Sequence, residues 1–169
     1  MVDIAIGHAV PVQISAKTDY ALRALCVLAA APDGELTQAA EIARGQTIPQ
    51  SFLEGILTEL RRAGLVESRR GAEGGHRLGR PAFGIVLADV VRVMDGPLAL
   101  VHGERPENMT YPDPAGHLQD VWVAVRAGLR LVLESTTLEQ VVQGRLPIEV
   151  TGLCEPRRSW TSVWPPLPG

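Results

Sequence analysis

Apolar residues recur every three or four positions from Ile14 onward, the spacing expected of helices that bury one face. The first such stretch predicts a helix that Ser15 caps and that reaches about Ala31. Pro32-Asp33-Gly34 then predicts a turn. Residues 1–12 alternate only weakly and form an N-terminal extension, which suits a short strand or a disordered segment equally well.

Two short helices with a tight turn between them are predicted next. Thr37 caps the first, over residues 38–44, and Gly45 ends it. The second opens at Pro49 and stops at Gly64. Its apolar positions, which we expect on one buried face, are Phe52, Leu53, Ile56, Leu57 and Leu60. Its opposite, polar face carries Gln50, Ser51, Glu54, Thr58, Arg61 and Arg62.

A basic hairpin follows these helices. Residues 65–70 and 76–78 are predicted as two strands, and the glycine-rich segment 71–75 as the loop between them. The net charge of the chain is −3, but positive charge is concentrated here. Positions 60–80 contain only two glutamates but six arginines, Arg61, Arg62, Arg69, Arg70, Arg77 and Arg80.

The second half of the chain is predicted to hold a helix over 86–94, a long helix over about 115–134 and a short last helix. Thr137 and Gln140 form a capping box for the last helix, which ends at Gly144. The fold class is therefore mainly α with a small two-stranded wing, a winged helix-turn-helix plus a long C-terminal helix. We divide the chain into the extension 1–12, the winged helix-turn-helix 13–97, a loop 98–116, the long helix and short last helix 117–146, and a flexible tail 147–169.

Composition narrows the functional classes. Hydrophobic residues make up 46% of the chain, enough for a real core, and no apolar run approaches the ~20 residues that span a bilayer. We read no secretory signal at the start, and two isolated cysteines suit a reducing, cytoplasmic setting. The glycine-rich loop lacks the Lys-Ser/Thr pair of a phosphate-binding loop, and no nucleophile elbow is present. We therefore expect no enzyme.

Two helices, a tight turn and a glycine-tipped basic hairpin together favour DNA recognition. The second helix suits a major groove and presents its polar face to base edges. Arginines of the hairpin suit phosphates or a narrow minor groove, and its glycines allow close approach. Two plainer readings stay open, since the polar face can be solvated surface and the arginine cluster can be surface charge or a protein-docking patch.

At this point the chain resembles the bacterial winged-helix regulator family that includes the iron–sulfur regulator IscR, the nitric-oxide sensor NsrR and the cysteine-metabolism repressor CymR. The resemblance covers residues 13–146 and rests on six segments. These are ISAKTDYALR at 14–23, FLE at 52–54, LRRAGLV at 60–66, RGAEGGHRL at 70–78, DGPL at 95–98 and STTL at 135–138.

The resemblance implies that 13–97 is a DNA-binding domain and 98–116 a sensor-type loop. It also implies a homodimer, in which the long helix of 117–146 is the dimerisation helix and crosses to the partner. It also implies that Ser51 and Glu54 read bases and that Arg70 enters the minor groove. The full set of expected DNA contacts is Ser15, Lys17, Thr37, Gln38, Gln50, Ser51, Glu54, Arg61, Arg69, Arg70, Gly74, Gly75, His76 and Arg77. The expected dimerisation stripe is Leu118, Val121, Trp122, Val125, Leu129, Val132 and Leu133. The alternative is that this stripe packs only within its own chain.

Most well-known members of this family hold an iron–sulfur cluster through three cysteines in the segment before the long helix. Here that segment, 98–117, contains no cysteine, so we expect no cluster, no metal and no cofactor. Asp19, whose counterpart is a cluster ligand in the nitric-oxide sensors, is interpreted as a surface carboxylate or a remnant. His102 and His117 are read as polar loop residues, with a histidine–carboxylate metal site as the alternative. Cys26 is read as a core residue, with a redox switch as the alternative.

The sequence thus predicts a homodimeric, sequence-specific DNA-binding transcription regulator, a repressor, that lacks an iron–sulfur cluster. Its partners are double-stranded operator DNA, a second copy of itself and an unidentified small-molecule effector, and not a membrane. The alternative is a winged-helix module that docks another protein and does not read DNA.

Overall fold

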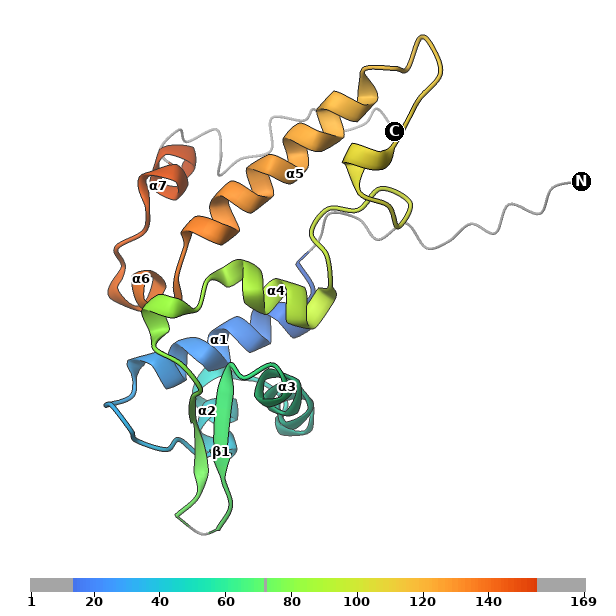
Figure 1. Ribbon diagram of the computed structural model, residues 1–169. Coiled ribbons are helices and arrows are strands. Elements are labelled where there is room, and N and C mark those ends of the chain that lie inside the picture. Colours follow the sequence, from blue (N-terminus) through green and yellow to red (C-terminus); the bar gives the residue numbers. More distant parts are fainter. Residues whose placement is uncertain (1–13, 72, 155–169) are drawn as a thin grey trace, which may run out of the picture.

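The computed structural model describes residues 14–71 and 73–154, and Figure 1 shows their arrangement. The N-terminal extension predicted for 1–12 lies outside the described residues. Helix α1 (Ala16–Ala30) begins as predicted, because the Ser15 side chain accepts a hydrogen bond from the backbone N–H of Thr18 (3.1 Å). Its buried residues Ala21, Ala24, Leu25 and Leu28 lie at helical spacing and enter the main core.

The helix-turn-helix consists of α2 (Ala39–Gln46) and α3 (Gln50–Arg62). The prediction that Thr37 caps α2 and that Gly45 ends it was wrong. Gln38 is the N-cap, with its backbone N–H donating to Glu41 Oε2 (3.2 Å), and the helix ends where Thr47 adopts a left-handed conformation (φ 54°). Thr37 is used elsewhere, since its backbone pairs with that of His76.

Helix α3 buries the face that its periodicity predicts, with one exception. Leu53, Ile56, Leu57 and Leu60 are all buried in the main core. Phe52 was predicted on the same face, but its side chain is 46% exposed. It lies at the edge of the stripe, where its ring meets Tyr20 edge to face with ring centroids 5.8 Å apart.

The wing is a two-stranded antiparallel sheet of β1 (Val66–Arg69) and β2 (Gly75–Leu78). Its register places Glu67 opposite Arg77 and Ser68 opposite His76. Val66 is buried while the rest of β1 is exposed, so the wing is attached at its base and projects from the body (Figure 1). A short 3₁₀ turn, η1 (Ala82–Gly84), follows.

The C-terminal half builds an arm on this body. Helix α4 (Leu87–Asp95) packs on α1 and α3 and is followed by the 3₁₀ turn η2 (Pro106–Asn108) and the long helix α5 (Leu118–Ser135). Helix α6 (Leu138–Gln143) returns to α1, with the predicted capping box of Thr137 and Gln140 in place and Gly144 at its end. In Figure 1, α5 and the segment before it project away from the wing, on the opposite part of the molecule.

The tail predicted to be flexible from residue 147 onward contains a helix. Helix α7 (Ile148–Cys154) begins where Pro147 O accepts from the N–H groups of Val150 and Thr151, at 3.0 Å each, and it packs against α5. The prediction was therefore wrong for residues 148–154, while 155–169 lie outside the described residues. Among the helices that the structure describes, none is long and apolar enough to cross a membrane.

Candidate nucleic-acid interface

The exposed face of α3 presents the polar residues that the sequence predicts. Gln50, Ser51 and Glu54 are all exposed at its N-terminal end. Gln50 Nε2 donates to Glu54 Oε1 (3.3 Å), which holds an amide and a carboxylate together, one turn apart. Because the opposite face of α3 is fixed in the core, these side chains project from a rigid support.

The wing carries two kinds of arginine. Arg77 is paired with Glu67 across the strands, through Nη2 (2.7 Å) and Nε (3.0 Å) to the same carboxylate oxygen. In the described parts of the chain, the guanidinium groups of Arg69 and Arg70 have no hydrogen-bonding or ionic partner. The wing therefore offers unneutralised positive charge at its tip, whereas Arg77 is largely balanced by Glu67.

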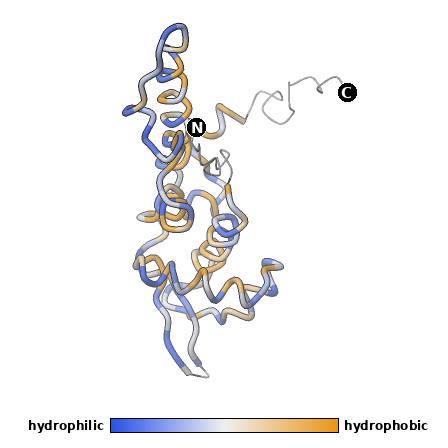
Figure 2. The backbone as a smooth tube through the Cα atoms, turned by 90° about the vertical axis from the view of Figure 1, so that its right-hand side faces the viewer, coloured by the Kyte–Doolittle hydropathy of each residue, from blue (hydrophilic) through white to orange (hydrophobic). Residues whose placement is uncertain are grey.

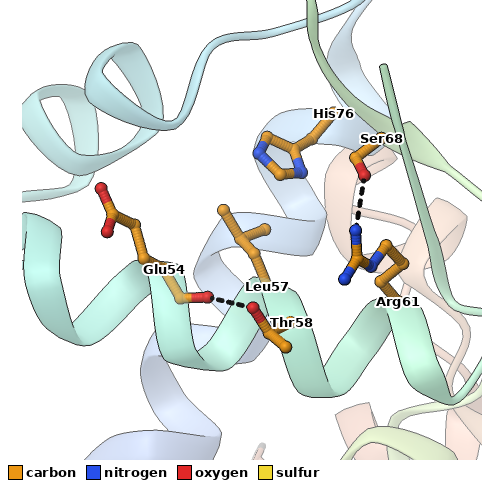
Figure 3. Close-up of a pocket in the computed structure, with 6 residues that line it drawn as sticks. All are labelled: Glu54, Leu57, Thr58, Arg61, Ser68 and His76. Atoms are coloured by element: carbon orange, nitrogen blue, oxygen red, sulfur yellow. Dashed lines mark hydrogen bonds between the residues drawn. The ribbon is translucent and has the colours of Figure 1, made fainter. Parts of the chain in front are cut away.

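A small cavity of about 160 Å³ joins α3 to the wing. Figure 3 shows its lining, which is Glu54, Leu57, Thr58 and Arg61 of α3 with Ser68 and His76 of the wing. Arg61 Nη1 donates to Ser68 Oγ at 3.4 Å, a long bond that links the two elements. Helix α3 and the wing thus form one continuous surface, whose lining is polar except for Leu57.

His76 lies in this cavity with an unsatisfied ring nitrogen. Its Nδ1 is buried and, within the described residues, finds no hydrogen-bond partner. Burial and the nearby Arg61 charge lower the pKa of His76 from its ordinary 6.5. The imidazole is consequently neutral at physiological pH, and it does not add to the positive charge of the surface.

Two glycines of the wing, Gly74 and Gly75, lie where the backbone leaves no room for a side chain. A Cβ on Gly74 would lie 2.2 Å from Arg69 O, and one on Gly75 would lie 2.8 Å from Thr37 O. The second approach is what lets Thr37 and His76 exchange backbone hydrogen bonds of 2.9 and 2.8 Å. The sequence had linked these glycines to close approach of DNA, and the structure gives them a role within the chain.

A family model described as Rrf2, iron-dependent transcriptional regulator, matches residues 14–144, which include the whole of this surface. The chain belongs to the Rrf2 family. It is therefore a DNA-binding transcription regulator with a winged helix-turn-helix, as the sequence predicts.

Relatives and solved structures agree with the Rrf2 assignment. A Mycobacterium tuberculosis H37Rv protein named as a putative HTH-type transcriptional regulator is 45% identical over 151 residues, which cover 89% of this chain and 94% of that protein. The solved structure of CymR, the global cysteine regulator of B. subtilis, is 32% identical with a TM-score of 0.68, covering 78% of this chain and 97% of that one. The T. potens IscR structure is 28% identical with a TM-score of 0.64, covering 79% and 88%.

The structure places Ser15 and Lys17 of this Rrf2 chain in contacts within the protein. Ser15 Oγ donates to Asp95 Oδ1 (2.6 Å), and Lys17 Nζ pairs with Glu59 Oε2 (2.7 Å). They join α1 to α4 and α3, so any DNA contact they make competes with these bonds. The sequence analysis did not predict that Asp95 accepts these hydrogen bonds from the start of α1. The one available indication was a carboxylate at the end of an amphipathic helix.

The predicted dimerisation stripe divides into two parts. Leu133 packs on a second small core of Ala88, Val91 and Leu98. In contrast, Leu118, Val121 and Val125 are 41%, 51% and 38% exposed, and none of the residues of α5 is buried. The remaining members of the stripe, Trp122, Leu129 and Val132, are half-buried.

The donor atoms of this Rrf2 chain do not fit an iron–sulfur cluster. The segment 98–117 offers no thiolate, Cys26 packs against the main core with its pKa raised by burial, and Cys154 lies at the end of α7. No group of three or more histidine, cysteine and carboxylate side chains within the described residues is placed to hold a metal ion. His117 is fully exposed beside Asp120 (3.5 Å), and Asp19 pairs with Arg23 (3.3 Å) on the surface of α1.

Proposed function

We propose that this Rrf2 protein is a cytoplasmic homodimeric repressor that binds double-stranded operator DNA and carries no iron–sulfur cluster. In this proposal residues 13–97 bind DNA, 98–116 receive the signal and 117–146 form the dimer. The observation that carries it is the continuous surface of α3 and the wing, joined around the cavity of Figure 3. Helix α3 enters a major groove with Gln50, Ser51 and Glu54 at base edges, and Arg70 of each wing lies in the neighbouring minor groove.

DNA binding is tested with fragments from the upstream region of the protein's own gene, by fluorescence anisotropy over a range of salt concentrations. We expect a salt-sensitive complex that Arg70→Ala weakens about tenfold or more, with a salt slope lower by roughly one, since one phosphate contact is lost. The matched control is Arg145→Ala, because Arg145 is an exposed arginine beyond α6, far along the chain from the wing. Absence of a salt-sensitive complex with every fragment would favour the protein-docking alternative.

The homodimer is supported by the exposed part of α5. Leu118, Val121 and Val125 follow one another at three- and four-residue spacing, so they share one face of the helix. Exposed apolar residues continue on α6, on α7 and between them, at Val141, Val142, Leu146, Ile148 and Leu153. Figure 2 shows hydrophobic segments along the projecting upper part of the molecule, which holds α5. A second copy that packs on this face removes it from water.

Sedimentation equilibrium tests the dimer. A charge at the centre of the face, Val121→Glu, is expected to convert the dimer to a monomer, because a buried unpaired carboxylate is strongly unfavourable. Leu131→Glu is the matched control. Leu131 is equally exposed (52%), but it lies ten residues beyond Val121 and off the shared face, so this variant is expected to remain dimeric. If the Val121→Glu variant remained dimeric, the exposed face of α5 would not be the dimer interface.

The repressor and effector parts of the proposal rest on the family and on the position of the 98–116 segment. Deletion of the gene is expected to raise transcription from the promoter that the protein binds. Lower transcription after deletion would indicate an activator. No catalytic role is proposed.

A further inference from the structure

A second cavity lies on the opposite part of the molecule from the wing, and it is lined by arginines. Its volume is about 450 Å³, within the range of small-molecule sites. Four of its lining residues are arginines, namely Arg92 of α4, Arg105 of the following loop, and Arg126 and Arg130 of α5. The Gly96–Leu98 turn after α4 supplies the rest of its wall.

The positive charge of this cavity is only partly neutralised. Glu134 accepts from Arg130 Nε (3.1 Å) and also from Arg92, while Glu107 lies 3.3 Å from Arg126 Nε. Two carboxylates therefore face four guanidinium groups at the cavity.

A third carboxylate, Asp89, lies near the cavity but does not balance it. Its Oδ1 is 3.6 Å from Arg92 Nη1, whereas its Oδ2 accepts a closer bond from Arg80 (2.8 Å), an arginine outside the lining. The charge of Asp89 is thus shared with Arg80, and the cavity keeps a surplus of positive charge. Like charges this close repel one another, so a bound anion stabilises the arrangement.

Arg105 and Arg126 differ in how far their guanidinium groups are already engaged. The side chain of Arg105 has no hydrogen-bonding or ionic partner within residues 14–71 and 73–154. Arg126 is 13% exposed, and its Nη1 donates to Leu98 O (2.8 Å). Its Nε is buried and lies 3.3 Å from Glu107 Oε1, so this nitrogen is already taken up inside the protein. Arg126 therefore adds positive charge to the wall of the cavity, and Arg105 supplies the uncommitted guanidinium group.

The arrangement suits oxygen anions with more than one charged group. Guanidinium groups bind carboxylate and phosphate oxygens through paired N–H donors, and Arg126 and Arg130, four residues apart on α5, present theirs from the same side of the helix. Arg92 and Arg105 approach from other elements. A monoanion would engage only part of this set.

We propose that this cavity binds a small polyanion, a molecule with two or more carboxylate or phosphate groups, held by Arg92, Arg105, Arg126 and Arg130. This inference rests on the proposed regulator function and gives its effector a site and a chemical class. The 98–116 segment, which the proposed function assigns to signal reception, contributes Arg105 and Leu98 to this cavity. The input of this chain is then a metabolite anion in place of a metal cluster.

Isothermal titration calorimetry on the full chain, without DNA, tests the site with citrate and inorganic pyrophosphate as separate probes. We expect saturable binding of one molecule per chain for at least one probe, and the preferred probe distinguishes carboxylate from phosphate chemistry. Arg105→Gln is expected to weaken it tenfold or more, since charge-assisted hydrogen bonds are lost. Arg126→Gln should do the same, but Arg105→Gln is the decisive variant because the Arg105 side chain makes no hydrogen bond or ion pair among the described residues.

Two control variants locate the binding. Arg145→Gln and Arg70→Ala are expected to bind the probe as the wild type does, because neither arginine lines the cavity. No saturable binding of either probe at millimolar concentration, or equal binding by Arg105→Gln, overturns the inference. Operator binding of the probe-free protein is measured in parallel. Normal DNA binding with no anion binding would refute only the proposed anion site. Anion binding without DNA binding would refute only the proposed function.

Discussion

The contact between the wing and the helix-turn-helix depends on Gly75, and Gly75→Ala tests this dependence. The added Cβ would lie 2.8 Å from Thr37 O and 3.0 Å from Thr37 C, both of them backbone atoms that cannot rotate away. Strand β2 would have to move off the segment before α2. The two backbone hydrogen bonds between Thr37 and His76, at 2.9 and 2.8 Å, would then lengthen or break.

The expected cost follows from those two bonds. Each backbone hydrogen bond contributes about 1 kcal/mol net, and displacement of the strand adds roughly 1 kcal/mol of strain. Loss of backbone freedom in the unfolded chain offsets about 0.5–1 kcal/mol, because alanine is less flexible than glycine. We therefore expect the free energy of unfolding to fall by about 2 kcal/mol.

Urea denaturation of the two proteins measures this difference, with DNA anisotropy as a second readout. The matched control is Gly45→Ala, since Gly45 lies inside α2 and a Cβ added there would meet no atom within 4 Å. That change should raise stability by about 0.5–1 kcal/mol, as alanine is the better helix former. If Gly75→Ala proved as stable as the wild type, the close approach of β2 to Thr37 would not exist as described.

Three further outcomes are expected. Leu53→Ala should cost about 2–5 kcal/mol in urea denaturation because its side chain is fully buried, whereas Phe52→Ala at the exposed edge should cost about half as much or less; equal costs would contradict the exposure of Phe52. At Asp95, burial raises the pKa but hydrogen bonds from the α1 N-terminus lower it further, so it lies below 3.8. Its stabilisation is present above pH 3.8 and is lost as the pH falls through the lowered pKa. The Tm gap between wild type and Asp95→Ala should therefore be largest near neutral pH and should narrow as the pH falls below 3.8. The pKa of His76 is lowered by burial, so the unfolded chain takes up a proton first and wild-type stability should decline as pH falls below 6.5; His76→Gln should show a flatter Tm profile there.

Local signals in the sequence predicted the elements whose ends are fixed by their own side chains. Ser15 and the Thr137–Gln140 capping box are such cases, since each satisfies backbone N–H groups a few residues away. Thr37 failed as a cap because its backbone is engaged by a strand 39 positions later, a contact invisible to local spacing. Helix α7 was missed for a related reason. A helix of this length is not stable by itself, and its packing against α5 stabilises it, which the local sequence after Pro147 does not show.

The candidate site was predicted as a set of residue types, but the sequence did not divide the arginines into free and paired ones. Arg69, Arg70 and Arg77 look alike as neighbours in a basic hairpin. The strand register separates them, because it sets Arg77 opposite Glu67 and leaves the other two without a carboxylate. The pair could have been predicted by counting residues outward from the centre of the hairpin loop, because Glu67 and Arg77 are equally far from residue 72.

Helix α4 connects the arginine cavity to the DNA-facing half of the molecule. Its last residue, Asp95, accepts hydrogen bonds from Ser15 and Thr18 at the start of α1, and the next residue, Gly96, lines the cavity.

Lys17 of the same α1 turn pairs with Glu59 of α3 and also donates to Met94 O at the end of α4. A polyanion that draws Arg92 and Arg105 together would act on the end of α4, and hence on the contacts that set α1 against α3. Such a ligand changes operator affinity only if it binds the DNA-competent and DNA-incompetent arrangements with different affinity. The same coupling requires operator DNA to change the affinity for the anion by an equal factor, so the two titrations performed in either order must close a thermodynamic cycle.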